Sequence, residues 1–254
     1  SEIVDLKILY VEVNTTAYYN PSQIASASDL RTAIISSLNS YAKNVELNKF
    51  GGRFKYSKVN TLIDRVDNGI TSNITKVIIR RDLKALLNQF AQYELCFGNK
   101  FHINPEGYNI KSTGFKVSGS DSTVFFTDVP NKNANGSLDG SNKGVLSAIS
   151  RDNKNELRVI VKSVGMVDYA KGEILLNTIN ITETNADNDI IEIQAFPDSN
   201  DVIGLKDLYL SFDVSNTKIN MVKDVIASGE DVSGVVFSRD YYTSSYSNGK
   251  LERE

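Results

Sequence analysis

Beyond residue 86 the chain is a succession of short β-type runs separated by turn-rich breaks. The runs are rich in β-branched and aromatic residues, which suit the pleated surface of a strand. They lie at residues 93–103, 115–119, 122–129, 144–152, 156–169, 172–182 and 190–196. Short strands at regular spacing predict a sandwich-like β domain over residues 89–203. The longest break, residues 131–144, carries three Gly and four Asn and predicts a surface loop or a hairpin tip.

The first 88 residues predict a small mixed module instead, in the order β-α-α-β. Residues 3–14 place Val4, Leu6 and Ile8 at alternating positions, which indicates a half-buried strand. Residues 26–47 then carry apolar side chains at steps of three and four, the spacing of an amphipathic helix. Ser26 or Ser28 is suited to cap that helix, because a hydroxyl oxygen can accept a hydrogen bond from the free N–H groups of the first turn.

A second, shorter helix follows the Gly51-Gly52 break. We expect Ser57 to cap it. Its apolar face is expected to consist of Val59, Leu62, Ile63 and Val66. Asn68-Gly69 is expected to end it, because glycine tolerates the left-handed conformation of many helix ends. Residues 70–81 predict the outgoing strand.

Residues 204–254 predict a carboxy-terminal strand at 205–214, a short helix near 220–230 and a Tyr-rich tail. The tail suits either a frayed terminus or an aromatic contact segment that orders on a partner. Loops and termini have little intramolecular reason for an aromatic composition, which makes their side chains candidates for interfaces. These candidates are Met221, Val225, Ile226, Tyr241, Tyr242 and Tyr246. The fold class expected for the whole chain is α+β, with several domains.

Catalytic chemistry finds little support in the 254 residues. His102 is the only histidine and Cys96 the only cysteine. If both lay on one regular strand they would be roughly 20 Å apart, too far for a nucleophile and its base. The same two residues cannot supply four zinc ligands. We therefore predict no catalytic residue, no metal and no cofactor.

Other ligand classes are equally weak. Asn185, Asp187 and Asp189 have the spacing that opens a calcium loop, but Ile190 stands where that loop needs glycine. A looser cation site with Asp198 and Asp201 stays open. The basic residues Lys76, Arg80, Arg81 and Lys84 could bind phosphate, although solvated strand ends are the preferred interpretation.

The net charge argues against nucleic acid as a partner, and the hydropathy pattern argues against a membrane span. The formal charge is −3 and the basic residues are scattered, so no concentrated surface for nucleic acid is visible. No run of about 18 apolar residues predicts a membrane span. A single cysteine fits a reducing compartment such as a bacterial cytoplasm.

Residues 32–83 resemble the baseplate J-like family of contractile-tailed phages and related injection machines. In that family a Gly-containing turn precedes a Ser-initiated helix and an outgoing strand. The matching positions here are Ser57, Val59, Ile63, Val66, Gly69 and Ile70. Residues 169–202 resemble the same family's hairpin followed by a strand ending in Pro. Over its whole length the chain is similar to the carboxy-terminal part of the large inner-ring wedge subunits of T4-like phages.

The resemblance implies a non-catalytic structural protein. It would form homodimers, join other wedge proteins in a ring around the central hub, and be assembled in the host cytoplasm into the virion tail baseplate. Two alternatives are kept. One is a tail-associated glycan hydrolase, since the 31 acidic residues make carboxylate pairs plentiful. The other is a receptor or carbohydrate-binding module, suggested by the β-rich middle and the tyrosines.

Overall fold

The computed structural model describes residues 7–43, 47–151, 157–225, 246–247 and 250–251. Strands dominate it, and its two α-helices both belong to the first quarter of the chain. The predicted α+β class is broadly compatible with this architecture, with more strand and less helix than the label suggests. Neither helix combines the length and apolar character needed to cross a lipid bilayer.

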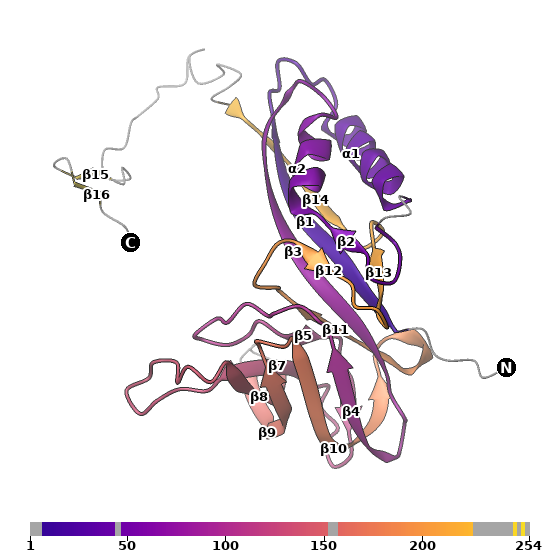
Figure 1. Ribbon diagram of the computed structural model, residues 1–254, viewed down its shortest axis with the longest axis vertical. Helices are drawn as coiled ribbons and strands as arrows, with labels where there is room; N and C mark the ends of the chain where they lie inside the picture. The colour runs from indigo at the N-terminus through magenta and orange to yellow at the C-terminus, as the bar shows by residue number, and fades with distance from the viewer. Residues whose placement is uncertain (1–6, 44–46, 152–156, 226–245, 248–249, 252–254) are drawn as a thin grey trace.

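Six strands form the first sheet, in the order β13-β1-β3-β11-β5 with β14 also pairing with β1. Its long strands run diagonally through the molecule (Figure 1). Their bounds are β1 Ile8–Tyr19, β3 Ile70–Lys84, β5 Lys111–Ser112, β11 Ile190–Ala195, β13 Tyr209–Phe212 and β14 Lys218–Lys223.

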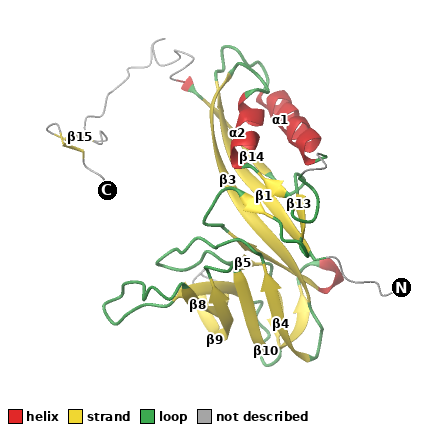
Figure 2. Ribbon diagram, viewed as in Figure 1, coloured by secondary structure: helices red, strands yellow, loops and turns green. Residues whose placement is uncertain are grey.

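Six further strands form the second sheet, in the order β4-β10-β9-β8-β7 with β6 also pairing with β10. It lies below the first sheet, as Figure 2 shows. Its bounds are β4 Phe90–Cys96, β6 Phe115–Val117, β7 Phe125–Pro130, β8 Lys143–Arg151, β9 Leu157–Asp168 and β10 Glu173–Thr184. The remaining elements are short, namely the pair β2 Arg53–Phe54 and β12 Val202–Ile203, the 3-10 turn η1 Asp187–Asp189, and the pair β15 Tyr246–Ser247 and β16 Lys250–Leu251.

The first sheet draws strands from all three segments that the sequence suggested as domains. β11 and β5 come from the predicted sandwich, and β13 and β14 from the carboxy-terminal segment. One continuous set of buried apolar side chains then runs through both sheets. The division into residues 1–88, 89–203 and 204–254 stays a prediction.

Helices α1 Ala27–Ala42 and α2 Tyr56–Asp64 pack on each other, with α1 also against β14 and α2 against β3. The buried face of α1 is Leu30, Ile34 and Leu38, and Ser26 Oγ accepts a hydrogen bond from the Asp29 N–H at 3.2 Å. The predicted helix is confirmed over Ala27–Ala42, and Ser26 is its cap rather than Ser28. It ends earlier than predicted, because Leu47 already lies in a turn.

The predicted face of the first strand is wrong by one residue. Leu9, Val11 and Val13 are fully buried, whereas Ile8 and Tyr10 are half-buried. A shift of one position exchanges the two faces of a strand. Tyr10 points to the other side, where its ring lies over Arg80 with the guanidinium carbon 4.2 Å from the ring centroid.

The capping of α2 also differs from the prediction. The helix begins at Tyr56, so Ser57 lies inside its first turn and is exposed. A residue distant in sequence provides the cap, because Asp201 Oδ1 accepts the Tyr56 N–H at 2.8 Å. Sequence inspection of residues 55–60 offers no signal for this contact.

Asp201→Ala is expected to destabilise the protein by about 1 kcal/mol, because it removes an acceptor and a negative charge from the start of α2. Ser57→Ala should change the unfolding free energy by less than about 0.5 kcal/mol. Urea denaturation followed by circular dichroism distinguishes the two variants. The opposite ranking would restore Ser57 as the cap.

Gly69 does not end α2 either, because the helix stops at Asp64 and the glycine lies in the turn before β3. Its φ is not in the left-handed region. A side chain is excluded there for want of space, since a Cβ atom would lie 2.6 Å from Ile24 Cδ1. Gly69 is thus a packing position for Ile24.

The predicted helix near residues 220–230 is wrong over its first part. Lys218–Lys223 is strand β14, parallel to β1 with Ile219 opposite Thr15 and Met221 opposite Ala17.

The long break at 131–144 is confirmed as the tip of the β7–β8 hairpin. Met221 packs partly buried against the core, and Val225 is 37% exposed. Ile226, Tyr241 and Tyr242 lie outside the described residues, and Tyr246 belongs by its backbone to β15.

Candidate functional site

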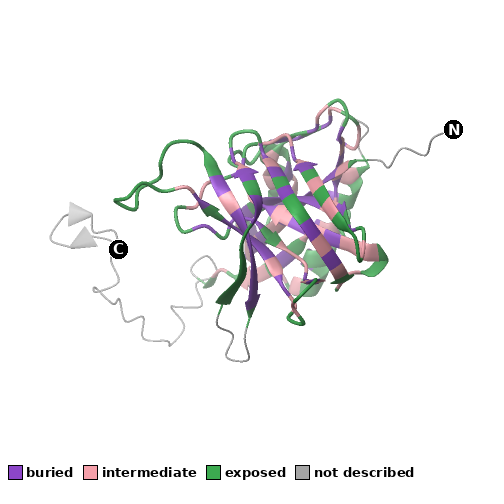
Figure 3. Cartoon of the chain, turned by 90° about the horizontal axis from the view of Figure 1, so that it is seen from below, coloured by how far each residue is buried: buried purple, intermediate pink, exposed green. Residues whose placement is uncertain are grey.

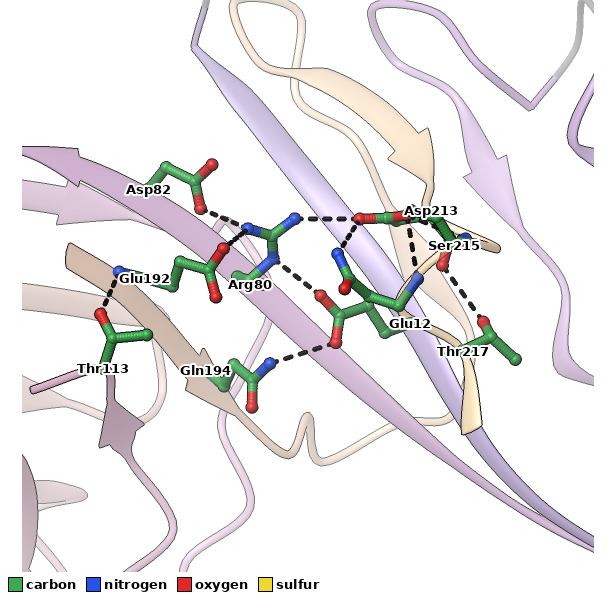
Figure 4. A network of polar contacts seen from close by, with 10 residues as sticks. Glu12, Arg80, Asp82, Thr113, Glu192, Gln194, Asp213, Ser215 and Thr217 are labelled. Atoms are coloured by element: carbon green, nitrogen blue, oxygen red, sulfur yellow. Dashed lines mark hydrogen bonds and ion pairs between the residues drawn. The ribbon is translucent and has the colours of Figure 1, made fainter. Parts of the chain in front are cut away.

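The most concentrated polar arrangement in the described chain surrounds Arg80 in the middle of β3 (Figure 4). Four carboxylates bind its guanidinium. The distances are 2.7 Å from Nε to Glu12 Oε1, 2.8 Å from Nη1 to Asp82 Oδ1, 2.8 Å from Nη1 to Glu192 Oε1 and 3.0 Å from Nη2 to Asp213 Oδ2. We call these five residues the arginine cluster. It joins β1, β3, β11 and the turn after β13, which are far apart in the sequence.

Sheet register brings most of the cluster together. Tyr10 and Gln194 lie opposite Arg80, and Glu192 lies opposite Asp82. Because side chains alternate along a strand, Arg80 and Asp82 share a face. Gln194 Nε2 donates to the second oxygen of Glu12 at 3.1 Å and so holds that carboxylate in place.

Asp213 reaches the cluster from a tight turn. One oxygen accepts hydrogen bonds from the Ser215 N–H at 3.1 Å and from the Ser215 hydroxyl at 2.5 Å, while Asn216 Nδ2 donates to the other oxygen at 2.7 Å. Burial would raise the pKa of Asp213, but these donors and Arg80 lower it. The net result is a lowered pKa, which favours the charged form of Asp213.

Burial and the neighbouring charges together set the other pKa shifts in the arginine cluster. Only 5% of Arg80 is exposed, and burial opposes its charge, but Asp82, Glu192, Glu12 and Asp213 outweigh burial and raise its pKa. Burial raises the pKa of Glu12 and of Asp82 above the ordinary range, even though Arg80 acts in the opposite direction. One cation thus faces an excess of negative charge.

The preferred interpretation of the basic residues was wrong for two of the four. Arg80 and Arg81 are buried, whereas Lys76 and Lys84 are exposed. Arg81 Nη1 donates to the Cys96 carbonyl at 2.5 Å, and burial lowers its pKa. A phosphate cannot reach Arg80, because its guanidinium is already bound by carboxylates on three nitrogens. The cluster acts as a structural clamp.

Other candidates from the sequence are not brought together. Cys96 lines a cavity of about 310 Å³ beside Arg81, and His102 lines a separate hollow of about 320 Å³. Among the described residues no group of three or more His, Cys, Asp or Glu is arranged to hold a metal. Of the possible calcium ligands, Asp201 instead caps α2.

The six motif positions of the resemblance cluster around α2. Val59 and Ile63 are fully buried, Ile70 is buried at the start of β3, and Val66 is half-buried against the core. Ser57 and Gly69 have the positions described above.

The sequence analysis did not identify five residues of the polar arrangement around Arg80, namely Glu12, Asp82, Glu192, Gln194 and Asp213. The signal for four of them was available, since Glu12, Arg80-x-Asp82 and Glu192-x-Gln194 place charged or polar residues inside otherwise apolar strands.

The charged centre of the first sheet is thus filled by the side chains of the chain itself. In the comparison with known families, residues 7–82 match the model described as baseplate structural protein gp6, C-terminal domain III. No curated protein matches the chain. The matched segment runs from the start of β1 to Asp82 and includes both helices. It covers 76 of the 254 residues.

The match confirms the resemblance to a baseplate wedge protein over this segment. Residues 7–82 are therefore similar to a structural domain of a baseplate protein. A structural family also agrees with the expectation that the chain is not an enzyme.

Proposed function

We propose that the chain forms a homodimer within the baseplate and links neighbouring wedges into the ring around the central hub, after assembly in the host cytoplasm. The matched baseplate domain supports a role in assembly. The observation that carries the finer proposal is an uncovered face on the first sheet. The helices pack against one side of β1, β3 and β14, toward which the odd-numbered residues of β1 point.

The opposite side carries two cross-strand rows. Thr16 lies between Ile74 and Asn220, and Tyr18 lies between Ser72 and Val222. Ile74 is 56% exposed, although it is a large apolar residue in the middle of a strand. We call these six residues the open face. In a two-fold dimer the same patch serves both copies, so one apolar residue is used twice.

The test is sedimentation velocity of the full chain at micromolar concentrations. The unmodified protein is expected to sediment as a dimer, and Ile74→Glu to weaken the dimer by at least about tenfold, because two like charges would then enter one interface. Ile203→Glu is the matched control, since Ile203 is 49% exposed on β12, outside the open face. A wild-type protein that stays monomeric at every concentration, or a dimer that both variants leave intact, would refute this assignment of the open face.

A further inference from the structure

Two neighbouring arginines on β3 have opposite surroundings. Arg80 is bound by four carboxylates, whereas Arg81 forms no ion pair within the part of the chain that the structure describes. Only 8% of Arg81 is exposed, and its hydrogen bond is the one from Nη1 to the Cys96 carbonyl. A guanidinium has five N–H donors, and a buried charge without a charged partner is unfavourable. Arg81 is therefore a buried cation that has donors left for a ligand.

Arg81 lines the cavity of about 310 Å³ that also contacts Cys96. Leu205 and Leu208 form an apolar part of its wall. The turn that carries them is held in place, because the Leu205 carbonyl accepts the N–H of Gly51 at 2.9 Å and that of Leu208 at 3.2 Å. Cavities that bind small molecules combine apolar walls with a few placed polar groups, and the volume here suits a small ligand.

The charged groups of this cavity come from different sheets according to their sign. Both cations belong to the first sheet, since Arg81 lies on β3 and Lys7 directly precedes β1. Glu94 and Glu173 come from β4 and β10 of the second sheet, and Asp207 comes from the turn before β13. Among the described residues no ion pair joins either cation to any of these acids. Opposite charges thus line one cavity without touching each other.

Strand register fixes the acidic wall. Glu173 lies opposite Cys96, and Glu94 is two positions before Cys96, in a stretch of the β4–β10 ladder without a bulge. Exposed and buried residues alternate there, with Glu94 exposed and Leu95 buried, as the strands of Figure 3 illustrate. The two glutamates and Cys96 therefore share one face of the second sheet. Glu173 has Lys171 at 3.7 Å, whereas Glu94 forms no ion pair with any described residue.

These charges favour a ligand that carries both signs. An anion would pair with Arg81 but would also meet the carboxylates of the opposite wall. A cation would pair with Glu94 and would leave Arg81 without a partner. A short molecule with a carboxylate at one end and an ammonium group at the other complements both walls at once.

We propose that the cavity binds a small zwitterion, with its carboxylate on Arg81 and its ammonium group between Glu94 and Glu173. Arginine can bind a carboxylate through two parallel hydrogen bonds, and an ammonium group offers three donors for the acids. Leu205 and Leu208 cover the chain that joins the two charged groups. No residue of the open face lines this cavity, so the proposal does not depend on the homodimer.

Isothermal titration calorimetry of the full chain tests the proposal with amino acids of increasing chain length, from glycine to aminohexanoate. Butyrate and butylamine are the controls with a single charge, and all titrations share one ionic strength because salt screens charge pairs. The best amino acid of the series is expected to bind at least about tenfold more tightly than either control. Equally tight binding of butyrate or butylamine, or no binding of any amino acid, would overturn the proposal.

Variants then locate the ligand. Glu94→Gln, at an exposed position that tolerates substitution, should weaken binding of the best amino acid by at least about tenfold. Arg81→Met should abolish binding and stay folded in urea denaturation, because an apolar side chain can replace a buried cation that lacks a charged partner. Glu106→Gln is the matched control, an exposed acid outside the cavity, and should bind as the unmodified protein does. Unchanged affinity in Glu94→Gln would contradict the proposal whether or not Arg81→Met folds.

Discussion

Arg80→Ala is expected to lower the free energy of unfolding by about 3–5 kcal/mol, because it leaves the charges around it without their cation. Glu12 is 4% exposed and cannot recover its hydration without moving β1. The cluster also ties β11 and the turn after β13 to β3, so the loss should spread over the first sheet. Urea denaturation monitored by circular dichroism measures the change.

Two further variants separate charge from geometry. Arg80→Lys keeps the positive charge but loses the planar guanidinium that binds several carboxylates at once. It should therefore lower the free energy of unfolding by less than Arg80→Ala does. Lys76→Ala, on the same strand but exposed, should stay within about 0.5 kcal/mol of the unmodified protein. If Arg80→Ala were as mild as Lys76→Ala, the cluster would not be a clamp.

The cost of Arg80→Ala should also depend on pH. Arg80 lowers the pKa values of Glu12, Asp82 and Asp213, so its removal raises all three. A raised folded-state pKa favours the folded state below the unfolded pKa, and this advantage is lost as pH rises through the folded pKa. The difference between wild type and variant should therefore be largest near neutral pH and shrink as pH falls through the pKa values of Glu12 and Asp82, which burial holds above their ordinary values. A pH-independent difference would mean that lost packing, rather than unpaired charge, is the cause.

Local patterns predicted the elements of the matched segment because those elements depend on local spacing. Leu30, Ile34 and Leu38 repeat at the helical period, and each is buried as that period requires. Val59 and Ile63 do the same in α2. The face of β1 was misjudged because both faces carry apolar side chains, and the sequence of the strand alone does not show which face the rest of the core covers.

The carboxy-terminal strand shows where local patterns fail. Ile219, Met221 and Val222 satisfy both a strand and one turn of a helix, since a run this short cannot distinguish the two periods. The choice is made by β1, whose edge offers backbone hydrogen bonds from Asn14 to Tyr19. A parallel partner some two hundred positions earlier leaves no mark in the sequence of β14 itself.

The arginine cluster was hidden for a related reason. Its closest charge pair joins Arg80 to Glu12, and its other contacts reach Glu192 and Asp213. Charged residues inside apolar strands are visible in the separate segments, but only the strand order β13-β1-β3-β11 shows that they surround one guanidinium. The same order explains why the solvated interpretation failed for Arg80, which lies in a central strand of the sheet.

Ile63→Asp is expected to have the largest effect of any single change considered, at least about 4 kcal/mol, because it buries a carboxylate that no partner can reach in the apolar core. Ile63 is fully buried on the inner face of α2, where it helps to hold the helix against β3. The variant should unfold at much lower urea concentration or fail to accumulate as folded protein. It should also fail to assemble, as a consequence of misfolding.

Val66→Asp supplies the graded comparison, since Val66 is only half-buried in the turn after α2 and its carboxylate can reach water. Its cost should be smaller than that of Ile63→Asp by more than about 1 kcal/mol. Ser57→Asp is the matched control on the same helix: the position is exposed, and an acid in the first turn interacts favourably with the helix dipole. A soluble Ile63→Asp protein with the stability of Ser57→Asp would show that the inner face of α2 does not pack against β3.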